Sequence, residues 1–119
     1  MGTRADFYVG NGENAKWLGS IAWDGHEFAK DDDHPIRKAK TEGEYRKAVT
    51  DLLKSREDGT TPEMGWPWPW NDSGLTDFAY FWDGDKVQWN KWDGNYPDMS
   101  EKKNIAWGDR SGVMSFQGR

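Results

Sequence analysis

One segment of the chain, residues 42–58, has the pattern of a long amphipathic helix. Thr41 and Glu44 have the spacing of a capping box, in which two side chains satisfy free N–H groups at the start of a helix. Apolar residues then recur at helical spacing: Tyr45, Ala48, Val49, Leu52 and Leu53. Gly59 follows where a C-terminal cap belongs. Because no other segment has this pattern, we expect neither a helix bundle nor a doubly wound fold.

The rest of the chain contains short segments typical of strands, in which apolar and polar residues alternate or turn residues flank an apolar run. They cover residues 5–9, 17–23, 77–82, 86–92, 104–107 and 113–116. We expect the first two to pair as an antiparallel hairpin, and Asp83-Gly84-Asp85 to form the turn of a second hairpin. The sequence therefore predicts one α+β domain over residues 1–119. Its antiparallel sheet has about five or six strands, with one main amphipathic helix packed on one face.

The core of this domain is expected to be aromatic. Leu, Ile, Val and Phe supply 16 of the 119 residues, a share that alone would indicate disorder, but the chain also holds nine Trp and four Tyr. Alternation in the second strand segment places on one face Trp17, Gly19, Ile21 and Trp23. In the third it groups Phe78, Tyr80 and Trp82. The tryptophans that we expect in the core are Trp17, Trp23, Trp82 and Trp89.

Several classes of protein are disfavoured by what the sequence lacks. The chain has no Cys, which excludes disulfide scaffolds, Cys-ligated zinc and thiol chemistry. With 16 Lys and Arg against 21 Asp and Glu, the net charge of −5 disfavours general nucleic-acid binding and binding to anionic membranes. No apolar run has the length of a signal peptide or a membrane span. We expect a cytoplasmic protein with no membrane contact.

Residues 26–40 are charged and irregular, and we expect a loop with a short helical turn. Three contiguous carboxylates, Asp31, Asp32 and Asp33, precede His34 in this segment. Calcium loops space their ligands at alternate positions around a glycine, so this run does not predict a metal site. The chain also lacks a nucleophile elbow and a phosphate-binding glycine loop. We therefore expect no catalytic residue and no cofactor.

Three tryptophans alternate with two prolines over residues 66–70, a segment that we call the Trp-Pro arm. Proline donates no backbone hydrogen bond, so the arm cannot be a central strand, and its backbone is held extended. Two interpretations remain open. Either the arm covers the core as a lid, or it presents aromatic surface to a partner, for which rigid aromatic side chains are well suited.

Two segments, residues 60–70 (TTPEMGWPWPW) and residues 2–10 (GTRADFYVG), resemble small uncharacterised proteins carried by phages and prophages. The resemblance is confined to these segments and brings no activity, cofactor or functional residue with it. It implies a phage setting, in which small acidic domains often bind and disable a host protein.

The sequence thus favours a non-enzymatic protein-interaction module, such as a phage-encoded modulator or inhibitor of a host or defence protein in the host cytoplasm. Its candidate contact residues are Trp66, Trp68, Trp70, Asp31, Asp32 and Asp33. The alternative is a small-ligand binding protein in which tryptophan faces stack on a sugar or a nucleobase.

Overall fold

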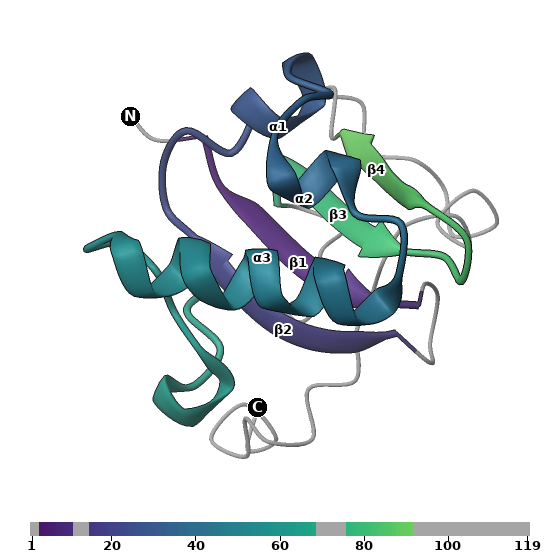
Figure 1. The fold of residues 1–119 in the computed structure, drawn as a ribbon. Helices are drawn as coiled ribbons and strands as arrows, with labels where there is room; N and C mark the ends of the chain where they lie inside the picture. The colour runs from purple at the N-terminus through teal and green to yellow at the C-terminus, as the bar shows by residue number, and fades with distance from the viewer. Residues whose placement is uncertain (1–2, 11–14, 69–75, 92–119) are drawn as a thin grey trace, which may run out of the picture.

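A computed structural model describes residues 3–10, 15–68 and 76–91 (Figure 1). Its sheet contains the strands β1 (Ala5–Val9), β2 (Lys16–Ile21), β3 (Phe78–Trp82) and β4 (Val87–Lys91). The helices are α1 (Glu27–Lys30), α2 (Pro35–Lys38) and α3 (Glu42–Ser55), followed by the 3₁₀ turn η1 (Pro62–Met64). Figure 1 shows the three α-helices on the same side of the sheet. The α+β class is confirmed.

The sheet is mixed, whereas the sequence predicted an antiparallel one. The strand order is β2-β1-β3-β4, and both hairpins pair antiparallel as expected, but β1 and β3 run parallel. The reason is the long connection after β2, which carries the helices across one face and returns β3 to the free edge of β1 in the same direction. The described residues hold four strands instead of five or six. The segments predicted over residues 104–107 and 113–116 lie outside the described residues.

A β-bulge in β2 overturns the predicted alternation of that strand. Phe7 pairs with Gly19 and Tyr8 pairs with Trp17, so Leu18 is an extra residue in β2. Trp17 therefore packs on the face opposite the helices, while Ile21 joins the core beneath them. Gly19 is required at the bulge, because its φ is 150° and an added Cβ would lie 2.6 Å from the carbonyl oxygen of Thr60.

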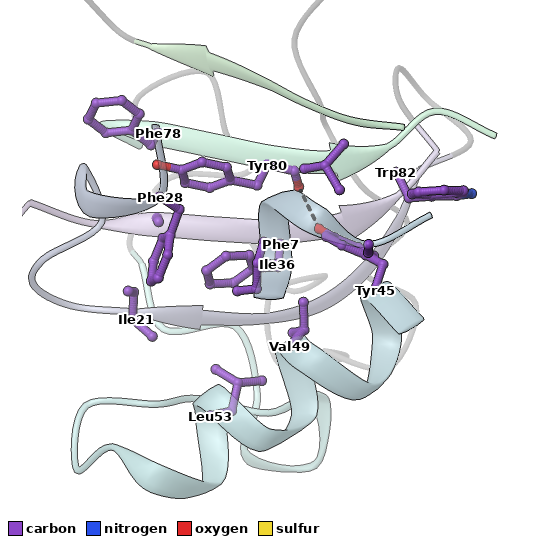
Figure 2. Close-up of a cluster of buried hydrophobic side chains, with 13 residues drawn as sticks. Phe7, Ile21, Phe28, Ile36, Tyr45, Val49, Leu53, Phe78, Tyr80 and Trp82 are labelled. Atoms are coloured by element: carbon purple, nitrogen blue, oxygen red, sulfur yellow. Dashed lines mark hydrogen bonds between the residues drawn. The ribbon is translucent and has the colours of Figure 1, made fainter. Parts of the chain in front are cut away.

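The main core lies between the sheet and α3, as Figure 2 shows. In β3, every second residue faces this core, as the sequence predicted. The sheet contributes Phe7, Ile21, Phe78, Tyr80 and Trp82. From the helices come Phe28, Ile36, Tyr45, Val49 and Leu53. The hydroxyl of Tyr45 donates to the backbone carbonyl of Tyr80 at 3.2 Å, which satisfies a buried polar group and joins α3 to the sheet (Figure 2).

The start of α3 matches the prediction, and its end does not. The hydroxyl of Thr41 accepts from the N–H of Glu44 at 3.1 Å, as in a capping box, but the Glu44 carboxylate accepts from Lys40 instead of Thr41. The helix ends at Ser55, before the predicted residue 58. Gly59 is not its cap: an added Cβ there would lie 2.5 Å from the backbone oxygen of Leu53, so this glycine allows close packing against the helix.

Two of the four tryptophans expected in the core are not buried. Trp17 and Trp82 are buried as predicted, but Trp23 is 48% exposed and Trp89 is 38% exposed. Trp23 lies beyond β2, which ends at Ile21, so strand alternation no longer applies to it. Trp89 lies on the outer strand β4, where it contacts Phe78 on one side.

Candidate functional site

The described part of the Trp-Pro arm covers the sheet face opposite the helices. Trp66 is 7% exposed and packs edge-on against Trp17, with ring centroids 5.0 Å apart. The two rings share a second buried cluster with Tyr8 and Phe81. Burial of this size in the free protein favours the lid interpretation for Trp66. Trp70 lies outside the described residues.

Trp68 is half-buried and is tied to a buried carboxylate. Its indole N–H donates to Oδ1 of Asp6 at 2.7 Å, and the hydroxyl of Ser20 donates to the same oxygen at 2.5 Å. Trp17 in turn donates to the hydroxyl of Ser20 at 3.0 Å. Asp6 is fully buried, so this network compensates for removing the carboxylate from water. The guanidinium of Arg4 lies over the Trp68 ring, 5.8 Å from its centroid.

The sequence reasoning did not single out Asp6 as the anchor of the arm. A signal was present, because alternation in β1 places this carboxylate on the same side as Tyr8, where its pairing partner is Ser20. What the sequence does not show is the contact with Trp68, which lies 62 residues from Asp6 along the chain.

The acidic loop lies elsewhere, between α1 and α2 on the helix side of the sheet. Asp31, Asp32 and Asp33 are exposed, and each offers a carboxylate oxygen within 4.8 Å of the others. Within the described ranges no further carboxylate or His completes this set. A side-chain oxygen of Asp31 accepts from the N–H of Asp33 at 3.0 Å, which shapes the turn into α2. The structure therefore does not bring the loop and the arm together.

His34, which follows the acidic loop, caps α2. Its Nδ1 accepts from the N–H of Ile36 at 3.1 Å, and its ring packs edge-on against Phe28 with centroids 4.6 Å apart. Burial lowers the pKa of His34, while the nearby Asp31 and Glu27 partly oppose this shift. The neutral imidazole is the form that accepts this hydrogen bond, so protonation would remove the cap.

A second carboxylate, Asp58, holds the end of β2 in place. One oxygen accepts from the N–H groups of Ala22 and Trp23 at 2.9 and 3.0 Å, and the other accepts from Arg56 at 2.6 Å. Burial alone would raise the pKa of Asp58, but these hydrogen bonds lower it below its usual value. The role of this carboxylate is structural, because its partners are the backbone and an Arg that it orients.

The groove between α2 and α3 is a candidate site that the sequence reasoning missed. It has a volume of about 480 Å³, and its apolar lining comes from Pro35, Ala39 and Ala48. The small side chains of the two alanines leave this space where the helices meet. Three exposed lysines surround it: Lys38, Lys40 and Lys47. The signal available in the sequence was the run Lys38-Ala39-Lys40 just before the capping box.

Of the three lysines around this α2–α3 groove, one forms an ion pair with a described residue and two do not. Lys47 forms an ion pair with Asp51 at 3.0 Å, and the Glu44 carboxylate accepts from the backbone N–H of Lys40. The ammonium groups of Lys38 and Lys40 form no ion pair with any residue that the structure describes. The groove thus combines an apolar floor with two lysines that are available to an anionic group.

Among the tryptophans that the structure describes, the exposed ones do not form a common stacking platform. Trp23 follows β2 and Trp89 lies in β4, and these two strands are the opposite edges of the sheet. Among the described helices, none is long and apolar enough to cross a membrane.

Comparison of the chain with protein-family models, with curated proteins and with solved structures finds no match.

Proposed function

We propose that the protein is a non-enzymatic protein-interaction module, and that the α2–α3 groove is its docking surface. The observation that carries the proposal is a groove of about 480 Å³ with an apolar floor, beside two lysines without ion-pair partners among the described residues. Protein interfaces are commonly anchored by a side chain that fills such a pocket, surrounded by a polar rim. The volume is within the range of pockets that hold small ligands.

The titratable groups support a binding role over a catalytic one. Catalytic sites gather groups with shifted pKa values in one cleft. Three of the described groups with shifted pKa values serve the fold: Asp58 holds β2, His34 caps α2, and Tyr45 joins α3 to the sheet. None of these three side chains lines the groove.

The placement of the Trp-Pro arm moves the proposed contact surface away from Trp66 and Trp68. Their rings are engaged with Trp17 and Asp6, so presenting them to a partner would require the lid to open. The exposed acidic loop Asp31, Asp32 and Asp33 stays available and leads directly into α2. A host or defence protein as the target, in a phage setting, is the narrower form of this proposal, and it rests on the resemblance of residues 2–10 and 60–70.

Affinity capture from lysate of the cells in which the protein acts tests the proposal with three forms of the full chain. Ala48→Tyr fills the groove, and Thr50→Tyr adds the same side chain at an exposed position of α3 outside the groove. We expect at least one protein to be retained by wild type and by Thr50→Tyr and to be lost with Ala48→Tyr. Thermal melts of both variants verify that they fold. Capture of the same proteins by all three forms would contradict the docking role of the groove.

A further inference from the structure

We infer that the α2–α3 groove binds an acidic segment of a partner protein, in which one large apolar side chain is flanked by carboxylates. This inference rests on the proposed function and names the chemistry of the partner. It follows from three properties of the groove: its apolar floor, the pairing of its charges, and the position of Lys38 and Lys40, which form no ion pair with a described residue.

The apolar floor requires an apolar side chain in the ligand. Ala39 is buried and Ala48 is half-buried, and with Pro35 they line a space that their own side chains do not fill. Placing a large apolar group there removes further apolar surface from water, at roughly 25 cal/mol per Å². A small inorganic anion would leave this floor unused.

The charges require an acidic ligand. Of the three lysines at the groove, Lys47 already has Asp51 as its partner, whereas Lys38 and Lys40 have no ion pair within the described ranges. The groove lining holds three Lys against two carboxylates, Glu44 and Asp51, which leaves it a net charge of +1. A purely apolar ligand would cover these two ammonium groups and leave them without a partner, which is unfavourable.

The net charge of −5 does not prevent such binding. At physiological ionic strength the Debye length is about 8 Å, so distant carboxylates contribute little to the potential at the groove. The exposed Asp31, Asp32 and Asp33 precede α2, whereas Lys38 is the last residue of this helix and Lys40 comes after it. The carboxylates of the ligand should therefore lie at the end of the groove that is farther from the acidic loop.

Fluorescence anisotropy with the full-length protein tests the inference. The probe is a fluorescein-labelled peptide with one Phe between two Asp-Glu pairs. One matched peptide replaces the Phe by Ser, and another replaces every acid by its amide. We expect the acidic Phe peptide to bind about tenfold more tightly than either, a difference of about 1.4 kcal/mol, and to weaken as salt is raised.

Charge reversal identifies the groove as the site. Lys38→Glu with Lys40→Glu should weaken binding of the acidic Phe peptide by about tenfold or more. The matched control is Lys30→Glu with Lys54→Glu, which changes the net charge equally at exposed positions outside the groove and should leave the affinity nearly unchanged. If the reversed pair unfolds, Lys38→Gln with Lys40→Gln provides the same comparison with a smaller expected loss.

Each remaining outcome overturns the inference. Equal binding of the acidic peptides with Phe and with Ser would indicate a nonspecific anion site, and preference for the amide peptide would indicate a purely apolar one. No binding of any peptide, or equal effects of both charge-reversed pairs, would exclude this groove as an acidic-segment site. If lysate capture still depends on Ala48 in those cases, the proposed function stands and only the partner chemistry is wrong.

Discussion

Replacing Trp68 with Phe tests whether the Trp-Pro arm is held as a lid by the buried Asp6 carboxylate. The substitution keeps an aromatic ring and removes the indole N–H, which lies 2.7 Å from Oδ1 of Asp6. Asp6 is 0% exposed and keeps the hydroxyl of Ser20 as a donor to the same oxygen. A hydrogen bond to a charged group contributes about 1.5–3 kcal/mol, so we expect Trp68→Phe to lower the free energy of unfolding by that amount.

Urea unfolding followed by far-ultraviolet circular dichroism measures this loss without relying on the altered tryptophan fluorescence. For a chain of this size, about 4 °C of melting temperature corresponds to 1 kcal/mol, so the expected shift is about 6–12 °C. Trp23→Phe is the matched control, because the same change at an exposed tryptophan should cost less than about 0.5 kcal/mol. A Trp68→Phe variant as stable as this control would refute the anchoring role of Asp6.

Three further predictions concern the lid, the helix and pH. Trp66→Ala should cost about 3–5 kcal/mol in chemical unfolding because a buried ring is lost, and a loss below about 1 kcal/mol would mean that the arm does not cover the sheet. Leu53→Ala should cost about 2–5 kcal/mol. Leu52→Ala should cost less than Leu53→Ala, because Leu52 is only half-buried, and the reverse order would show that α3 is rotated. The pKa of His34 is lowered on folding, so the unfolded chain takes up this proton at higher pH, and stability should fall as pH drops below about 6.5. His34→Asn keeps a capping side chain without this proton, so melts from pH 7.5 to 5 should lose that part of the pH dependence, and an unchanged profile would exclude His34 as its source.

Local sequence signals were sufficient for the elements whose stability is local. Thr41 begins α3 because its hydroxyl meets the N–H of Glu44 three residues away, and that spacing is visible in the sequence. The β3–β4 hairpin forms around Asp83, whose carboxylate accepts from the N–H groups of Asp85 and Lys86. Both interactions join residues within one turn, so neither depends on the rest of the fold.

The candidate site was less accessible to sequence reasoning. The Trp-Pro arm was recognised, and its proline pattern excluded a central strand, but the choice between lid and contact surface depended on Asp6 and Trp17. The α2–α3 groove was missed because its floor consists of small residues that the helical pattern places beside the core. An Ala in the apolar stripe of a helix predicts that this position faces the core. It does not predict whether a neighbouring helix fills the space beside that Ala or leaves a groove there.

The amino-acid order alone determined the start of α3, the two hairpins, the α+β class and an aromatic core. Each of these depends on periodicity or on contacts within a few residues. The parallel pairing of β1 with β3, the bulge at Leu18, the early end of α3 and the indole–carboxylate contact under the arm depend on long-range packing. Gly19 must clear Leu53, and Asp6 must meet Trp68, and both contacts exist only after α3 and the arm have packed on opposite faces of one sheet. Alternation along a strand cannot encode such contacts, since it describes each strand without its neighbours.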